Sequence, residues 1–220
     1  MKGEIKIITH KQAVDFLLPK HYSGRTPQIT KAFGWYIGNE LVAVCTFGKP
    51  ASHSLCIGLC GKEYASKVYE LNRLCRIDNF KEPLSQFVSG CLKQLKSEDW
   101  IIVSYADTGM SHNGYIYQAC NFIYTGKTKQ RTDKYVGAGK HSRHYDKTAI
   151  EIYRQVRTAK HRYVYFATSK GKAKLYLKAL NYPICDYPKE KNKNYILGEY
   201  QKPTVIKVCN KSCETQEIYL

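Results

Sequence analysis

The sequence predicts an α/β protein in which a mixed, strongly twisted central sheet is flanked by helices and followed by a basic C-terminal extension. The first observation is a helical stripe in residues 83–96, where apolar side chains recur at i, i+3, i+4, i+7, i+8 and i+11. The second is the short apolar run that opens residues 100–106, which is typical of a strand covered on both faces. The third is the alternation of strands and helices after residue 67, which implies right-handed crossovers and at least one parallel strand pair.

The part of the chain before residue 67 predicts a strand, a helix and a β-hairpin. The expected elements are a strand at residues 5–9, a helix at residues 12–18, and strands at residues 32–37 and 41–47. Gly38 and Asn39 lie between the last two strands and suit a tight hairpin turn. Pro19 marks the end of the helix, and a polar loop follows it at residues 21–27.

Residues 67–126 carry the alternating pattern, and the pattern loosens after Gly126. The expected elements are strands at 67–74, 100–106 and 122–125 and helices at 83–96 and 115–121, and Pro83 suits a first helical turn. Further on, the sequence predicts a mobile basic loop at 127–147, a strand at 163–167, a short helix bearing Ala173, Tyr176, Leu177 and Leu180, and exposed surface at 186–195. We therefore expect a core over residues 1–126 and a basic part over residues 127–220 that completes the sheet, within one compact domain.

Composition predicts a cytoplasmic protein with mostly reduced cysteines. The chain has no run of 18 apolar residues, which argues against a membrane partner, and its first residues lack the apolar centre of a signal peptide. Two C-x3-C pairs, Cys56/Cys60 and Cys209/Cys213, have spacings that zinc sites use. The first pair lies in an apolar segment where thiols also pack as small hydrophobic groups, so both interpretations stay open.

The charge of the chain is unevenly distributed. It carries 35 Lys and Arg against 18 Asp and Glu, and residues 127–195 alone hold 18 of these cations and 5 of the acids. This segment also contains many tyrosines, a combination typical of a nucleic-acid surface. A solvated basic surface with no nucleic-acid partner is the alternative.

Residues 100–126 are the best candidate for a functional site. Polar side chains cluster where the strand at 100–106 ends, which is where open α/β sheets place their ligands. Asp107 follows the strand directly, and Tyr117 lies on the next predicted helix. Each has a structural alternative, because Asp is a good helix N-cap and a half-buried Tyr can anchor a core.

Specific motifs in this region resemble known families. The element order resembles the GNAT family of N-acetyltransferases, in which a Tyr five residues before a Phe acts as general acid; Tyr117 and Phe122 match that spacing. More narrowly, four segments resemble the phage Mom family of DNA adenine-modifying proteins. They are YELNRLC (69–75), SYADT (104–108), HNGYIYQACNFIYTG (112–126) and KHRYVYF (160–166).

The resemblance implies a GNAT-like transferase that adds a carbamoylmethyl (acetamido-type) group to the exocyclic amine of adenine in DNA. Such a modification protects phage DNA from host restriction, and the protein would act in the host cytoplasm. The resemblance also implies iron, with His21, Tyr22 and Tyr117 at the matching positions. An acyl-CoA-like donor is expected for the fold, but residues 76–83 lack the glycines of the usual pyrophosphate loop. The donor therefore stays open.

The adenine amine is a poor nucleophile, so its attack needs a base and the leaving group needs an acid. Asp107 is the candidate base and Tyr117 the candidate acid. The remaining candidates are Arg73, Ser104 and Tyr22 for orientation of the reactants, and Arg76, Ser85 and Gln86 for donor phosphates. For Arg73 the alternative is a structural ion pair with Glu70, and for Ser104 it is a structural hydrogen bond.

The expected partner is double-stranded DNA with the target adenine flipped out of the helix. Tyr124 and Tyr135 are candidates for stacking on that base. The residues expected to hold DNA phosphates are Lys140, Arg143, Arg154, Arg157, Lys160, His161 and Arg162. The sequence leaves open a homodimer. It also leaves open two other functions, a basic nucleic-acid-binding protein without catalysis and an N-acyltransferase for a small amine or a protein.

Overall fold

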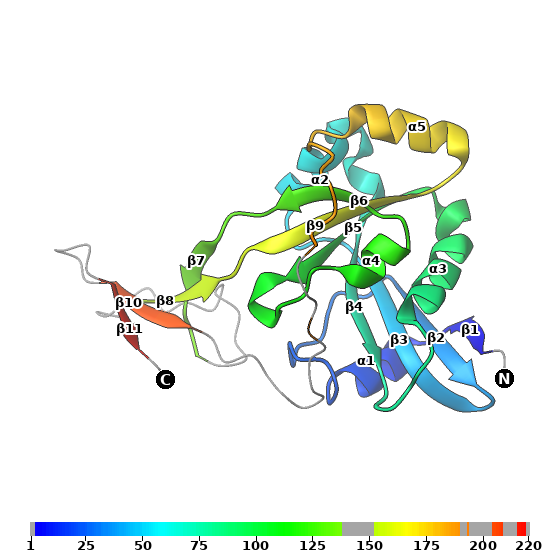
Figure 1. Cartoon of the computed structure of the whole chain (residues 1–220), viewed down its shortest axis with the longest axis horizontal. Coiled ribbons are helices and arrows are strands. Elements are labelled where there is room, and N and C mark those ends of the chain that lie inside the picture. The colour runs from blue at the N-terminus through cyan, green and yellow to red at the C-terminus, as the bar shows by residue number, and fades with distance from the viewer. Residues whose placement is uncertain (1–2, 138–151, 190–192, 194–203, 209–214, 219–220) are drawn as a thin grey trace.

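A computed structural model describes residues 3–137, 152–189, 193, 204–208 and 215–218 (Figure 1). The main sheet has seven strands in the order β1-β2-β3-β4-β5-β9-β6. They are β1 (Glu4–Ile7), β2 (Lys31–Ile37), β3 (Glu40–Gly48), β4 (Val68–Arg76), β5 (Trp100–Asp107), β9 (Lys160–Ala167) and β6 (Ile123–Lys127). Only β4 and β5 pair in parallel, so the sheet is mixed. The predicted fold class is confirmed.

Helices cover both faces of this sheet. They are α1 (His10–Leu17), α2 (His53–Cys60), α3 (Leu84–Gln94), α4 (Tyr115–Ala119) and α5 (Lys170–Ala179), with short 3-10 helices η1 (Lys62–Lys67), η2 (Leu95–Glu98) and η3 (Thr108–Met110). The core under α3 and α4 contains Phe33, Phe47 and Trp100, whereas α2 and α5 cover Ile101 and Val164 on the opposite face. None of the helices in the described part of the chain is long and apolar enough to cross a membrane.

Local sequence explains the first elements. Thr9 caps α1, because its hydroxyl accepts a hydrogen bond from the Gln12 backbone while the Gln12 side chain accepts one from Thr9 N–H. The β2–β3 hairpin turns at Gly38, whose φ of 59° suits a glycine. Both elements lie where the sequence predicts them.

The unit β4-α3-β5 supplies the parallel strand pair. The predicted apolar stripe of α3 is buried, with Phe87, Val88 and Cys91 fully enclosed. Pairing between β4 and β5 stops at Leu71 and Ser104, and the Ser104 hydroxyl donates to the Leu71 carbonyl at 2.9 Å. Beyond this bond the two strands separate. A register shift between β3 and β4, where Asn72 has no partner in the ladder, bends β4 at the same level.

Two features of the main sheet were not predicted. Strand β9 lies between β5 and β6, antiparallel to both, so the strand that follows α4 is an edge strand. The apolar segment at residues 53–60 is the helix α2, in which Cys56 and Cys60 are buried against the sheet. The packing interpretation of this cysteine pair is thereby supported, while Cys209 and Cys213 lie outside the described residues.

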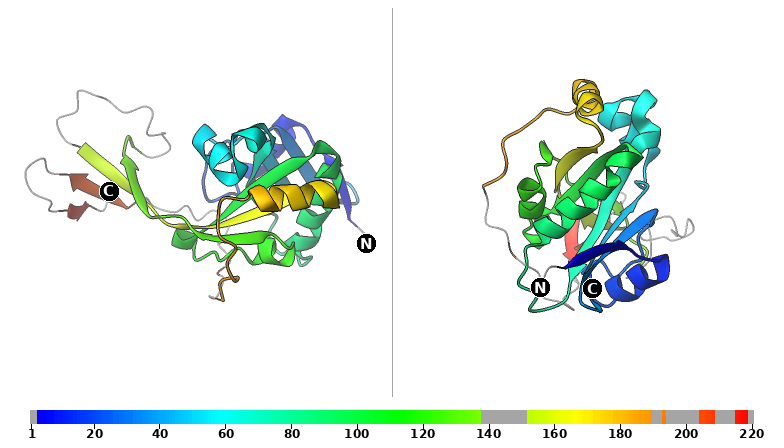
Figure 2. Two further views of the ribbon diagram at one scale, coloured as in Figure 1. Left: turned by 90° about the horizontal axis from the view of Figure 1, so that it is seen from above. Right: turned by 90° about the vertical axis from the view of Figure 1, so that its right-hand side faces the viewer.

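A second sheet has four strands in the order β11-β10-β8-β7. They are β7 (Arg131–Lys134), β8 (Ile152–Arg157), β10 (Val205–Val208) and β11 (Thr215–Ile218). Figures 1 and 2 show this sheet projecting from one side of the main sheet, away from the N-terminal end. The prediction of a mobile loop over residues 127–147 is wrong at β7, which pairs with a distant strand; residues 138–147 lie outside the described part. The domain division at residue 126 stays a prediction.

Asp99 ties the start of β5 to three other parts of the fold. Its carboxylate accepts hydrogen bonds from Thr168 at 2.6 Å, Tyr176 at 2.9 Å and Lys172 at 2.9 Å, and it pairs with Lys67. Burial alone would raise the pKa of Asp99, but these donors hold the pKa well below its ordinary value. The carboxylate therefore joins α5 to the main sheet.

Replacing Asp99 with Asn should lower the free energy of unfolding at neutral pH by about 1–3 kcal/mol, because charge-assisted hydrogen bonds are lost. A carboxyl with a depressed folded-state pKa stabilises the fold above its unfolded pKa, and this contribution disappears as pH falls through the folded pKa. Urea unfolding at neutral and acidic pH should thus show the two proteins converging in acid. Asp15→Asn, which removes an exposed pair with Lys11, is the control and should leave the free energy of unfolding nearly unchanged. Equal losses would contradict the role of Asp99.

Candidate functional site

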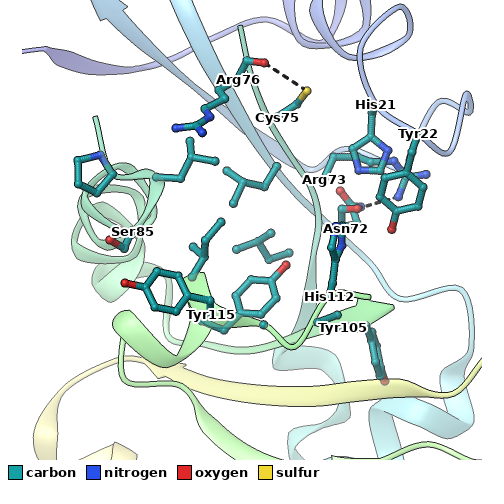
Figure 3. Close-up of a pocket in the computed structure, with 18 of the residues that line it drawn as sticks. His21, Tyr22, Asn72, Arg73, Cys75, Arg76, Ser85, Tyr105, His112 and Tyr115 are labelled. Atoms are coloured by element: carbon teal, nitrogen blue, oxygen red, sulfur yellow. Dashed lines mark hydrogen bonds between the residues drawn. The ribbon is translucent and has the colours of Figure 1, made fainter. Parts of the chain in front are cut away.

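A cavity of about 440 Å³ opens where β4 and β5 separate. Its walls come from β4, the loop that leads into α3, the end of β5, the α4 segment and the loop after α1 (Figure 3). Of the residues predicted for the site, it is lined by His21, Tyr22, Arg73, Arg76, Ser85, Tyr117 and Lys160. Glu70, Asn72, Tyr105 and His112 also line it and were not predicted as site residues.

One end of the cavity is aromatic. The rings of His21 and Tyr22 stack with centroids 4.4 Å apart, and His112 meets Tyr22 edge-on at 6.0 Å. Burial, with nearby Arg73 and His112, lowers the pKa of His21 to about 3, so its imidazole is neutral. Burial raises the pKa of Tyr22 to about 12, so its phenol keeps its proton. This end thus presents uncharged rings, a surface suited to a planar base.

Arg73 lies beside these rings. Its guanidinium donates to the carbonyl oxygens of Asn72 at 2.7 Å and Arg25 at 3.4 Å, while its buried Nε has no hydrogen-bond partner among the residues that the structure describes. The structural alternative of an ion pair with Glu70 is not observed within the described residues. A buried cation whose Nε is unsatisfied suits an anionic or carbonyl-bearing ligand in the cavity.

Glu70 is the residue that sequence reasoning missed. Its carboxylate accepts no hydrogen bond from any residue of the described ranges, although it lines the cavity. Burial raises the pKa of Glu70, opposed by the positive charges of Lys160 and Arg73. The motif YELNRLC contains this residue, but strand alternation alone gives it no more weight than its neighbours. A buried carboxylate with a raised pKa and no fixed donor is suited to accept a proton.

Tyr117 packs in the core and also borders the cavity, and its role as an acid stays a prediction. Its ring packs against Phe122 at 5.3 Å and Tyr163 at 5.4 Å, and it borders the cavity. Burial raises its pKa, while a hydrogen bond with Ser104 acts in the opposite direction. Ser104 is fully buried, and its hydroxyl donates to the Leu71 carbonyl of β4. The structural hydrogen bond that was the alternative for Ser104 is therefore observed. The Tyr117 phenol therefore keeps its proton at neutral pH.

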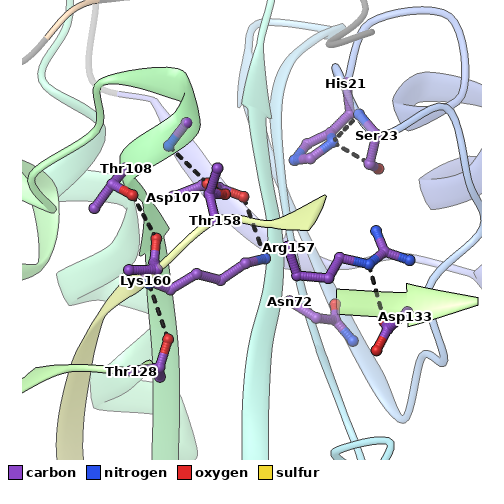
Figure 4. A network of polar contacts seen from close by, with 12 residues as sticks. His21, Ser23, Asn72, Asp107, Thr108, Thr128, Asp133, Arg157, Thr158 and Lys160 are labelled. Atoms are coloured by element: carbon purple, nitrogen blue, oxygen red, sulfur yellow. Dashed lines mark hydrogen bonds and ion pairs between the residues drawn. The ribbon is translucent and has the colours of Figure 1, made fainter. Parts of the chain in front are cut away.

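Asp107 does not line the cavity, and its carboxylate is already engaged (Figure 4). It accepts from the Gly109 backbone at 2.9 Å as the N-cap of η3, accepts from Thr158, and lies 3.4 Å from Lys160 Nζ. The capping alternative is therefore what this structure contains. The prediction of Asp107 as the base stays untested, but Glu70 is better placed for that role.

The other end of the cavity borders the start of α3. Arg76, Pro83 and Ser85 line it, whereas Gln86 does not. No side chain of the described ranges caps α3, and Gln86 N–H donates to the Pro83 carbonyl, so the Leu84 and Ser85 amides are the ones available to an anion. The loop before it turns at Asn79, with φ 59°, in place of a glycine. This end fits a phosphate group without the usual glycine-rich sequence.

The residues proposed for iron do not fit that metal. Tyr22 and Tyr117 are held as neutral phenols, and His21 is hydrogen-bonded through Nδ1 to Ser23 at 2.9 Å. Arg73 places a positive charge beside them. Within the described ranges, no cluster of three or more His, Cys, Asp or Glu side chains could hold a metal ion. We therefore assign no step to iron.

The predicted DNA-binding residues fall into three groups. His161 and Arg162 are buried, so the prediction that they contact DNA phosphates is wrong. Arg162 donates to Thr125 at 2.8 Å and stacks on the ring of Tyr182. The second group, Arg154, Arg157 and Lys160, is partly exposed, while Lys140 and Arg143 lie outside the described residues. Of the two tyrosines proposed for base stacking, Tyr124 is buried and Tyr135 is half-buried.

The fold and the cavity define a mixed α/β protein with a cavity between two diverging parallel strands. A model of the Mom protein family matches residues 2–189, and the chain belongs to that family. The predicted family is thereby confirmed. A search of curated proteins found no match.

Solved structures of acetyltransferases resemble this chain at low identity. An N-acetyltransferase from Staphylococcus aureus Mu50 has 12% identity and a TM-score of 0.47, covering 76% of this chain and 99% of that one. A putative acetyltransferase from Salmonella typhimurium with acetyl-CoA has 7% identity and a TM-score of 0.48, covering 77% and 96%. A Bacillus subtilis acetyltransferase in complex with CoA has 18% identity and a TM-score of 0.43, covering 75% and 99%.

Proposed function

We propose that this protein is a transferase that attaches a carbamoylmethyl-type group to the exocyclic amine of adenine in duplex DNA, and that this modification blocks restriction. Membership of the Mom family supports the proposal. The observation that carries it furthest is the cavity itself. Neutral aromatic rings lie at one end and an uncapped helix N-terminus lies at the other, and the cavity is also lined by the Glu70 carboxylate on β4, which has no hydrogen-bond partner within the described ranges.

In this proposal the flipped adenine occupies the aromatic end. Tyr22 and His112 provide ring surfaces for the base, and stacking of this kind contributes about 1–3 kcal/mol per base. Glu70 accepts the proton that the amine loses as its nitrogen forms the new bond to carbon. Tyr117 holds the proton that the leaving group takes when its bond to that carbon breaks.

The opposite end holds the donor. Arg76 and the first amides of α3 would bind its phosphates, as the uncapped helix end and the cavity lining suggest. To attach a carbamoylmethyl group, the amine nitrogen must bond to the methylene carbon as the bond from that carbon to the leaving group breaks. An acyl-CoA thioester reacts instead at its carbonyl carbon, releases a thiolate and would give an acylated adenine, so the proposed product requires a phosphate-bearing donor whose leaving group is on the methylene carbon. Arg73 is placed to orient the carbonyl oxygen of the transferred group through its unsatisfied Nε.

Mass spectrometry of nucleosides from the DNA of cells that express the protein tests this function. We expect a new deoxyadenosine species, heavier by the transferred group, together with resistance of the DNA to adenine-sensitive restriction enzymes. Cells carrying the empty vector are the control. If all deoxyadenosine is unmodified while the protein is soluble and folded, the proposed function is wrong, and a non-catalytic DNA-binding protein becomes the better interpretation.

A further inference from the structure

Strands β6 and β7 form one continuous basic edge. β6 is the outer strand of the main sheet and β7 the outer strand of the second sheet, and only residues 128–130 separate them. Four cationic side chains along this path are exposed, and we call them the basic edge. They are Lys127, Lys129, Arg131 and Lys134.

Charge is concentrated in this part of the fold. Residues 127–137 and 153–160 contain seven Lys and Arg and one acid, Asp133, whereas residues 3–126 contain 13 cations and 10 acids. Asp133 pairs with Arg157 at 3.0 Å and lies 3.6 Å from Arg131, so it compensates only part of the charge. Residues 127–137 and 153–160 are therefore strongly positive, while residues 3–126 are nearly balanced.

The basic edge begins at the rim of the cavity. Thr128 N–H donates to the Lys160 carbonyl at 2.8 Å, and Lys160 N–H donates to the Thr128 hydroxyl at 2.9 Å. Thr108, after β5, also binds the segment before β9, because its hydroxyl donates to the Ala159 carbonyl at 2.6 Å. Since Lys160 itself lines the cavity, the projecting strands start beside the site (Figure 4).

We propose that the basic edge is the surface along which one phosphate strand of duplex DNA lies, so that it delivers a nucleotide to the cavity. The inference rests on the proposed function and adds where the duplex is held. From Lys127 to Lys134 the strand covers about 23 Å at roughly 3.3 Å per residue. Its four cations can therefore contact up to four phosphates of one DNA strand.

Edge strands also carry lysines for another reason, since charge prevents sheets from pairing edge to edge. The two explanations make opposite predictions for DNA binding. A protective charge would leave DNA affinity unchanged when removed and would promote self-association. A phosphate-binding surface would lose affinity and salt dependence, because each phosphate contact contributes about 0.9 to the slope of log K against log salt.

The test compares the full-length protein with K127Q/K129Q/R131Q/K134Q, using anisotropy of a fluorescent DNA duplex over a range of salt. We expect at least about tenfold weaker binding and a salt slope reduced by roughly 3. The matched control is K93Q/K96Q/K174Q/K178Q, which removes the same charge from exposed positions on α3, η2 and α5. Its salt slope should stay within about 1 of the wild-type value. Thermal unfolding and size-exclusion chromatography verify the fold and the oligomeric state.

An unchanged slope and affinity in the basic-edge variant would overturn the inference, as would equal losses in both variants. Self-association with unchanged DNA affinity would identify the charges as edge protection and would also overturn it. The binding assay does not depend on catalysis. If the wild-type protein leaves adenine unmodified but the basic-edge variant alone loses DNA affinity, the proposed function fails while this inference stands.

Discussion

Replacing Glu70 with Gln is expected to reduce adenine modification by at least about a hundredfold while the protein stays folded. The glutamine side chain has nearly the same size but cannot accept the proton of the attacking amine. Activity of the wild-type protein should rise with pH through the raised pKa of Glu70, because only the ionised carboxylate is a base. In the variant this limb of the pH profile should disappear.

Stability provides a second readout of the same variant. Because burial raises the pKa of Glu70, the folded protein binds its proton more tightly than the unfolded chain does. Ionised Glu70 therefore costs stability above its unfolded pKa, and Glu70→Gln should leave the melting temperature unchanged or higher at neutral pH. A carboxylate retained for structure would show the opposite change.

Matched controls identify the proton acceptor. Glu40→Gln changes an exposed carboxylate at the start of β3 and should keep full activity. Asp107→Asn tests the base that the sequence suggested. If Asp107→Asn removes the pH limb while Glu70→Gln keeps it, Asp107 is the base and the assignment of Glu70 is wrong.

Tyr117→Phe is expected to lower the rate of transfer by about a hundredfold with little change in substrate affinity. The substitution keeps the ring that packs against Phe122 and Tyr163 and removes only the hydroxyl. Since burial raises the pKa of Tyr117, the wild-type phenol stays protonated at neutral pH and can supply a proton. The variant protein should bind DNA normally and should accumulate little product in single-turnover assays.

Tyr115→Phe is the control for this prediction. Tyr115 lies two residues away, lines the same cavity and is 67% exposed, so its hydroxyl stays in contact with solvent. We expect less than about a twofold change for it, within the range of a surface substitution. Equal effects of the two substitutions would show that Tyr117 is not a specific proton donor.

Local patterns in the sequence predicted the fold class and most strands and helices. The apolar residues of α3 recur with the period of a helix, and β5 opens with a continuous apolar run. Both patterns are visible within a short stretch of sequence. The place of β9 was not predictable in this way, because its pairing with β5 and β6 joins residues far apart in the chain. Likewise, α2 is apolar on most sides, and such a short segment cannot be distinguished from a buried strand by its period.

The sequence predicted mainly those residues of the candidate site that belong to recognisable motifs. Tyr22, Arg73 and Tyr117 are positions of the motifs described above, and all three line the cavity. The distribution of charge was a weaker guide to the site, because it does not show whether a charged side chain is exposed or buried. Arg162 belongs to a basic run yet is buried with Thr125 as its partner, while Glu70 acquires its character only from the cavity around it.

The short links between the two sheets have a mechanical consequence. Only two residues separate β8 from β9, and three separate β6 from β7, so the same two chain segments run through both sheets. The Asp107 carboxylate stabilises this junction, because it accepts a hydrogen bond from Thr158 and forms an ion pair with Lys160. A displacement of the projecting sheet would therefore act directly on the segments beside the rim of the cavity. Loosening this joint at Asp107 would misalign the reactants even if every reacting group were intact.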